Sequence, residues 1–223
     1  MEEVTSAKRK PKGQIKFQIT LSEEQKQAKS QILDNTITVL RGSAGSGKSM
    51  VAAQVALDLL FRRDIQKIVL TRPAVTSGEE IGFLPGDKDA KLAPYTAAVY
   101  DNMYRLYRKD IIDKHIADGN IEVIPLAFMR GRNLSDCFVV VDEAQNITHR
   151  QMELLLGRLC HGAKMILCGD TAQIDLKDKK QSGFDFVVKR LTTIPGFGVV
   201  TLKTNHRHEI VEPILNVYNE YRD

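Results

Sequence analysis

Short apolar runs along the chain alternate with longer amphipathic stretches. Runs of aliphatic and β-branched residues are typical of parallel strands that are buried on both faces. They occupy residues 36–40, 68–70, 121–124, 138–141, 164–167 and 199–202. Between them the pattern favours helices that begin near Glu23 or cover residues 51–61, 95–114, 151–159 and 209–221. This alternation predicts an α/β fold of three layers, in which helices cover both faces of a mostly parallel central sheet.

The remaining segments indicate how the chain is divided. Residues 76–94 are rich in Gly and Pro, which predicts a long functional loop. Basic residues precede the first helix at Lys8, Arg9, Lys10 and Lys12. We therefore expect a flexible basic arm over residues 1–18 and one domain over residues 19–223. Such arms are usually solvated tails, and contact with a polyanion is the alternative interpretation.

The first apolar run leads directly into a glycine-rich loop. Residues 42–49 read GSAGSGKS and fit the pattern G-x-x-x-x-G-K-[ST]. Glycines allow successive backbone N–H groups to converge on one anion, and the following helix adds its positive N-terminus. Lys48 is expected to pair with the β- and γ-phosphates of a nucleotide, and the Ser49 hydroxyl to ligate Mg²⁺. The predicted nucleotide contacts are Gly42, Ser43, Ala44, Gly45, Ser46, Gly47, Lys48, Ser49 and Met50.

Two later strands end in polar residues that suit the same chemistry. The run 138–141 is followed by Asp142, which we expect to hold Mg²⁺, and by Glu143, which we expect to orient and deprotonate a water molecule. An alternative is that these acids cap the next helix, but a cap explains only one of them. The run 164–167 leads to Gln173, a candidate for sensing the γ-phosphate. A simple turn at Gly169 is the alternative there.

Composition adds few constraints to this picture. The net charge of +4 and the pI of about 8.9 permit a polyanionic partner without requiring one. The three cysteines, Cys137, Cys160 and Cys168, lack metal-ligand spacing, and we expect buried free thiols in a reducing compartment. Mg²⁺ is the only metal expected. We see neither a signal peptide nor a membrane span, which predicts a cytoplasmic protein.

The motifs together resemble known families. DEAQN at 142–146 and GDTAQ at 169–173 are similar to motifs II and III of superfamily 1 helicases. With the glycine loop, TRPAV at 71–75, GEEIGFLPG at 78–86 and MRGR at 129–132, they resemble the PhoH family of P-loop ATPases. The resemblance runs from about Leu21 to the C-terminus. It implies a RecA-like P-loop NTPase fold and ATP as the ligand. The short length resembles the phage-type members of this family, which would place the protein in a host cytoplasm.

The resemblance also implies roles for residues outside these motifs. Gln25 lies where related ATPases carry a glutamine that contacts adenine, although Ser22 and Gln25 equally fit a helix capping box. The two roles are compatible. Arg207 matches the C-terminal arginine motif, which would stabilise charge on the γ-phosphoryl group of its own or a neighbouring chain. The usual pattern there is Val-Arg-His, whereas this chain has His-Arg-His.

Other arginines are weaker candidates. Arg130 and Arg132 are interpreted as contacts for phosphate, nucleic acid or a second subunit, and Arg72 as a nucleic-acid contact. Arg158 is a further candidate, but it follows Gly157 where the family more usually has Thr.

These features support two functions from different classes. The first is a Mg²⁺-dependent ATPase coupled to binding or remodelling of single-stranded RNA, or of DNA. A complete helicase motor has two RecA-like domains, and the pattern of elements predicts only one here. We therefore expect a homo-oligomeric ring, a hexamer by resemblance, in which Arg207 serves a neighbouring ATP site. The second is an ATP-gated scaffold or regulatory protein. A small-molecule kinase is disfavoured because Glu143 stands where a water-activating acid belongs.

Overall fold

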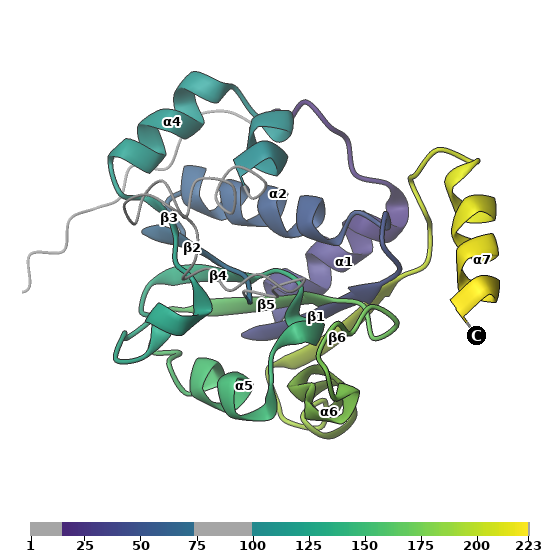
Figure 1. The fold of residues 1–223 in the computed structure, drawn as a ribbon. Helices are drawn as coiled ribbons and strands as arrows, with labels where there is room; N and C mark the ends of the chain where they lie inside the picture. Colours follow the sequence, from purple (N-terminus) through teal and green to yellow (C-terminus); the bar gives the residue numbers. More distant parts are fainter. Residues whose placement is uncertain (1–14, 74–99, 223) are drawn as a thin grey trace, which may run out of the picture.

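The computed structural model describes residues 15–73 and 100–222 (Figure 1). The predicted loop at 76–94, most of the basic arm and the first five residues of the predicted helix 95–114 lie outside this part of the chain. Across the described residues, six strands form one sheet: β1 (Ile37–Gly42), β2 (Lys67–Thr71), β3 (Ile121–Val123), β4 (Cys137–Val141), β5 (Lys164–Gly169) and β6 (Phe197–Leu202).

The sheet is parallel throughout, and its strand order is β3-β2-β4-β5-β1-β6. The α-helices with defined bounds are α1 (Glu23–Asp34), α2 (Lys48–Phe61), α4 (Lys109–Ala117), α5 (His149–Leu156), α6 (Gly183–Arg190) and α7 (Val211–Arg222), and residues 100–106 are helical as well. The predicted three-layer α/β fold is therefore confirmed. Because parallel strands end at one edge, the segments that follow β4, β5 and β1 lie next to one another.

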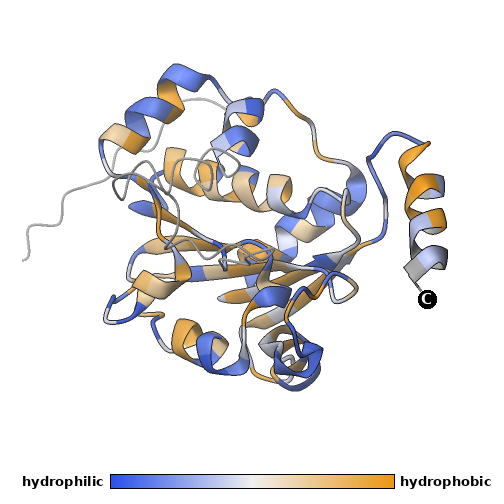
Figure 2. Ribbon diagram, viewed as in Figure 1, coloured by the Kyte–Doolittle hydropathy of each residue, from blue (hydrophilic) through white to orange (hydrophobic). Residues whose placement is uncertain are grey.

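Each central strand supplies apolar side chains to both faces of the sheet. In β4, Phe138 and Val140 join a core with α1, α2 and α4, whereas Val139 and Val141 join a second core with α5 and α6. Figure 2 shows the apolar strands between these two layers of helices. Burial on both sides explains why the strands appear in the sequence as continuous apolar runs.

Two helices differ from the prediction. The expected helix over 95–114 is broken, since residues 100–106 are helical and α4 begins only at Lys109. Leu106 and Ile112 are both fully buried, but they are six positions apart, which would place them on different sides of one straight helix. The break allows both to reach the core. The short helix α6 was not predicted, and it buries Phe184 and Val187.

The last helix, α7, stands clear of the sheet and its covering helices (Figure 1). Large apolar side chains on it are exposed: Ile214, Leu215, Val217, Tyr218 and Tyr221. Four of these positions, 214, 217, 218 and 221, follow the spacing of one helix face. Among the described residues, every helix is too short or too polar to cross a membrane.

Candidate active site

A cavity of about 420 Å³ lies at the edge where the parallel strands end. Its lining comes from segments that follow β1, β4, β5 and β6, together with the helical residues 100–106. The sequence predicted these members of the lining: Ala44, Gly45, Gly47, Lys48, Ser49, Met50, Asp142, Glu143, Gln173 and Arg207. Asn102, Arg105, Cys168, Asp170 and His206 complete it. The other predicted contacts are not part of this lining: Gly42, Ser43, Ser46 and Gln25.

The glycine loop wraps the N-terminus of α2. Gly45 and Gly47 have φ values of 90° and 85°, a left-handed conformation that side-chain-bearing residues rarely adopt. The Nζ atom of Lys48 donates to the carbonyl oxygens of Gly42 at 2.7 Å and of Ser43 at 3.0 Å. Gly47 precedes α2 and offers no side-chain cap. The first N–H groups of the helix are therefore suited to bind an anion at the cavity.

Ser49 and Asp142, the two predicted Mg²⁺ ligands, lie in direct contact at the cavity. The Ser49 hydroxyl donates to Oδ1 of Asp142 at 2.7 Å, and the backbone N–H of Asp142 is held by the Thr71 carbonyl at 2.9 Å. The described residues contain no cluster of three or more His, Cys, Asp or Glu side chains that could hold a metal by itself. One hydroxyl and one carboxylate suit Mg²⁺, which usually completes its coordination with water and substrate phosphates.

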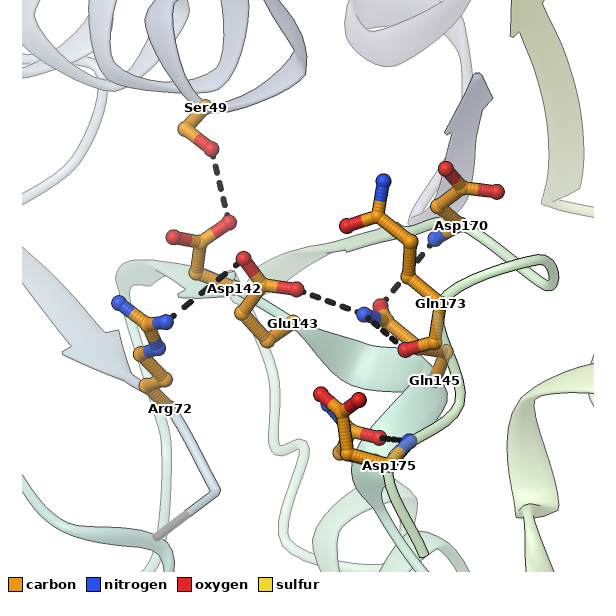
Figure 3. A network of polar contacts seen from close by, with 9 residues as sticks. Ser49, Arg72, Asp142, Glu143, Gln145, Asp170, Gln173 and Asp175 are labelled. Atoms are coloured by element: carbon orange, nitrogen blue, oxygen red, sulfur yellow. Dashed lines mark hydrogen bonds and ion pairs between the residues drawn. The ribbon is translucent and has the colours of Figure 1, made fainter. Parts of the chain in front are cut away.

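Glu143 follows Asp142 in an unusual backbone conformation, with φ of 51°. Its carboxylate accepts a hydrogen bond from Nε2 of Gln145 at 2.6 Å and lies 3.7 Å from Nη2 of Arg72, which follows β2 (Figure 3). Both side chains of this ion pair remain about a third exposed, at 37% for Arg72 and 36% for Glu143. The carboxylate is thus oriented from two sides and still accessible from the cavity.

Gln173 lies in the segment after β5, beside Glu143 and Asp170 (Figure 3). Its backbone N–H donates to the Asp170 carbonyl at 3.0 Å, so the turn considered as an alternative is present. Its side chain nevertheless lines the cavity. The turn and the cavity position are compatible, and sensing of the γ-phosphate stays a prediction.

Gln25 is buried beneath the glycine loop, with 2% of its surface exposed. It forms the predicted capping box with Ser22, which confirms that interpretation. Its Nε2 atom lies 3.5 Å from the Ser46 carbonyl and 3.2 Å from Nε2 of His206. These contacts place Gln25 as a support between the glycine loop and the segment after β6. Contact with adenine stays a prediction.

Arg207 lies on the segment after β6 and packs against the glycine loop of its own chain. A Cβ atom added to Gly45 would come within 2.5 Å of Cγ of Arg207. The backbone N–H of His206 donates to the Gly45 carbonyl at 3.0 Å. Upstream, the Glu24 carboxylate accepts hydrogen bonds from the backbone of Lys203 at 2.7 Å and Thr204 at 3.1 Å. The hydrogen bond from Lys203 lowers the pKa of Glu24 from its ordinary value.

The other candidate arginines do not line the cavity. Arg132 pairs with Glu122 of the edge strand β3 at 3.0 Å, and Arg158 donates to the Leu154 carbonyl at 3.4 Å. Arg105 does line it, as does Asn102, and neither residue was predicted from the sequence. A weak signal existed, because these polar residues neighbour the buried Met103 and Leu106 on one helical segment.

The cysteine prediction was correct at two positions of three. Cys137 and Cys168 are buried, whereas Cys160 is exposed in the turn that follows α5. Burial raises the pKa of the Cys168 thiol well above its ordinary value. Cys160 lies outside the apolar cores, and for that reason the expectation of a buried thiol was wrong there.

A parallel sheet, a glycine loop before α2 and an Asp-Glu pair after β4 define a protein of the RecA-like P-loop fold class. The chain belongs to the PhoH family, since the family model described as "PhoH-like protein" matches residues 18–219.

Named relatives agree with this assignment. A PhoH-like protein of Mycobacterium leprae is 42% identical over 191 residues, which are 85% of this chain and 55% of that protein. A PhoH-like protein of Bacillus subtilis is 42% identical over 181 residues, covering 80% of this chain and 57% of the relative. The chain thus spans about half the length of the curated relatives it matches.

Solved structures support the fold. The large terminase of a thermophilic bacteriophage matches with a TM-score of 0.53 and 11% identity, over 89% of this chain and 50% of that chain. Another crystal form of this terminase, in complex with ADP, matches with a TM-score of 0.50 and 14% identity, over 88% and 50% of the two chains.

Proposed function

We propose that the protein hydrolyses ATP in a Mg²⁺-dependent reaction at this cavity. The observation that carries the proposal is the convergence of three groups there: Lys48 on the glycine loop, the Ser49–Asp142 pair at 2.7 Å, and the carboxylate of Glu143. Lys48 is suited to bind phosphate, the Ser49–Asp142 pair is suited to bind a hard cation, and Glu143 is a base within the same cavity. This arrangement suits phosphoryl transfer to water.

In this proposal each residue has a defined role. Lys48 exchanges its contacts with the loop carbonyls for the β- and γ-phosphates, and the N–H groups of the loop hold the same anion. Ser49 and Asp142 would hold Mg²⁺, which would neutralise charge on the phosphates. Glu143 accepts a proton from the attacking water as the new O–P bond forms. The bond from the γ-phosphorus to the bridging oxygen breaks, and ADP and phosphate leave.

Arg207 is the cation that we propose for the γ-phosphoryl group. Its contact with Gly45 supports a role at the cavity of its own chain. A planar guanidinium in this position can stabilise the charge that develops on the transferred group.

We further propose that hydrolysis is coupled to single-stranded nucleic acid, RNA in preference to DNA, in a homo-oligomeric protein. Two features support binding of a polyanion close to Glu143: the net charge of +4 and the position of Arg72 next to that residue. The exposed apolar face of α7 supports self-association, and the resemblance suggests a hexameric ring. That same face also favours the second candidate, an ATP-gated oligomeric scaffold without motor activity.

The decisive variant is Glu143→Gln. We expect turnover to fall by about 10²- to 10⁴-fold while the Kd for Mg-ATP is preserved, since only the base is removed. Lys48→Ala should instead weaken nucleotide binding. The matched control is Glu153→Gln, the same change at an exposed position of α5, which should hydrolyse ATP at the parental rate. Parental turnover in Glu143→Gln would contradict the proposed base.

The two candidate classes differ in their response to nucleic acid. We expect single-stranded RNA to stimulate ATP turnover. We also expect the logarithm of its binding constant to fall linearly with the logarithm of the salt concentration, with a slope of about 0.7 per phosphate contact. Stimulation should be larger than with single-stranded DNA of the same length. Unchanged turnover with either polymer, in a protein whose mass changes with ATP, would favour the scaffold.

A further inference from the structure

The proposed catalytic base, Glu143, is hydrogen-bonded by Gln145, a residue to which no function has been assigned so far. Gln145 lies two residues after Glu143 in the short helix η3 (Ala144–Asn146), and only 1% of its surface is exposed. Its Nε2 atom donates to Oε2 of Glu143 at 2.6 Å. A buried amide that contacts an accessible carboxylate can fix the orientation of that carboxylate.

The same amide joins Glu143 to the segment after β5. Nε2 of Gln145 also donates to the Gln173 carbonyl at 3.1 Å, and its Oε1 atom accepts from the backbone N–H of Asp170 at 3.1 Å (Figure 3). The Gln145 carbonyl in turn accepts from the Ser182 hydroxyl at 2.7 Å. Both polar atoms of the side-chain amide and the backbone carbonyl of Gln145 are therefore hydrogen-bonded, so the amide forms a rigid bridge between the two segments.

Glu143 needs such a bridge because its backbone is strained. Its φ of 51° lies in the left-handed region, which residues other than glycine adopt mainly where surrounding contacts enforce it. A carboxylate on a strained turn can be directed at a water molecule only if its side-chain orientation is also restrained. Arg72 contributes at 3.7 Å, but Gln145 provides the shorter contact.

We infer that Gln145 is a positioning residue, which orients Glu143 toward the attacking water and ties it to the segment carrying Gln173. The inference rests on the proposed hydrolysis and assigns to that site a residue that acts through the base. Gln145 itself touches neither nucleotide nor water in this role. Its loss should therefore lower kcat and leave ATP binding unchanged.

The adjacent residue offers a matched control. Asn146 is also a buried amide of η3, with 4% of its surface exposed, and it also joins η3 to the segment after β5. Its side chain donates to the Asp175 carboxylate at 3.3 Å and accepts from the Asp175 backbone at 2.8 Å, so both amide atoms bond to Asp175 rather than to the Glu143 carboxylate. If Gln145 only anchored the segment after β5, as Asn146 does, replacing either residue should have the same effect on kcat.

The experiment compares Gln145→Met with Asn146→Leu, two replacements that retain side-chain size and remove the amide. We expect Gln145→Met to lower kcat by about 10- to 100-fold, the range for one lost hydrogen bond to a charged group, with unchanged Kd for Mg-ATP. Asn146→Leu should keep kcat within about threefold of the parent. If Gln145→Met does not fold, Gln145→Ala removes the same amide without adding a charge, and it should also lower kcat by at least about 10-fold with an unchanged Kd for Mg-ATP.

A double variant distinguishes positioning from general damage. If Gln145 acts only through Glu143, then Glu143→Gln combined with Gln145→Met should retain the residual turnover of Glu143→Gln alone. A further drop in the double variant, or equal losses in Gln145→Met and Asn146→Leu, would overturn the inference. Parental kcat in Gln145→Met would overturn it while leaving the proposed function intact. A parental protein without ATPase activity would overturn both.

Discussion

Replacing Gly45 by alanine tests whether Arg207 acts where the structure places it. The new Cβ atom would lie 2.5 Å from Cγ and 2.8 Å from Cδ of Arg207. Carbon atoms in favourable contact are about 3.5–4.0 Å apart, so the arginine must withdraw by about 1 Å or more. A displacement of this size at a reacting centre can cost about 100-fold in rate. We therefore expect Gly45→Ala to lower ATP turnover by about two orders of magnitude.

The substitution also introduces backbone strain, which needs its own control. Gly45 has φ of 90°, and an alanine in a left-handed conformation costs about 1–2 kcal/mol. Gly131 has φ of 80°, and a Cβ atom there would have no neighbour within 4 Å. Gly131→Ala therefore reproduces the strain without the clash. It should lower the Tm by a few degrees, as Gly45→Ala does, but hydrolyse ATP near the parental rate.

The assay is steady-state ATP turnover at saturating Mg-ATP, with Arg207→Ala measured in parallel and nucleotide binding followed separately. Both variants should turn over ATP well below the parental rate, because Gly45→Ala displaces the guanidinium that Arg207→Ala removes. The reasoning would be refuted if Gly45→Ala turned over ATP like the parent while Arg207→Ala was inactive.

Two further predictions concern stability and thiol chemistry. Because the Lys203 backbone lowers the pKa of Glu24, the stabilisation by this carboxylate is present above its ordinary value of 4.5 and is lost as the pH falls through the lower folded value. The parental Tm should exceed that of Glu24→Gln at neutral pH but not at pH well below 4.5, and a constant difference would contradict this. Iodoacetamide should modify Cys160 in the native protein and spare Cys137 and Cys168, as peptide mass spectrometry would show. Modification of all three thiols before unfolding would contradict their burial.

Strands were predictable because burial on both faces leaves a local signature. Val139 and Val141 pack on one side of β4 and Phe138 and Val140 on the other, so the whole run is apolar. Helix α6 left no such signature. Its buried residues Phe184 and Val187 do follow helical spacing, but the helix has only eight residues, too few to be recognised from the pattern. Short helices depend on tertiary packing, which the local pattern does not contain.

Some residues of the candidate site were likewise predictable from the sequence, and others were not. Lys48, Ser49 and Asp142 were predictable because each directly follows or begins a regular element, and parallel strands bring such positions to one edge. Arg105 and Gln145 were missed because their importance depends on partners distant in sequence. Gln145 was part of a recognised motif, yet only the distances to Asp170 and Gln173 reveal a bridge.

The position of Arg207 changes the argument for an oligomer. From sequence, a ring was expected partly because a single RecA-like domain needs an arginine from a neighbour to complete its site. In the structure Arg207 lines the cavity of its own chain, held through His206 and the Glu24 contacts upstream. If Arg207 acts at this cavity, as we propose, completion of the site does not by itself require a second subunit. The case for self-association rests instead on the exposed apolar face of α7. If the proposed self-association and hydrolysis both hold, replacing the apolar side chains of this face should yield a monomer that still hydrolyses ATP, as mass and turnover measurements on one variant would show.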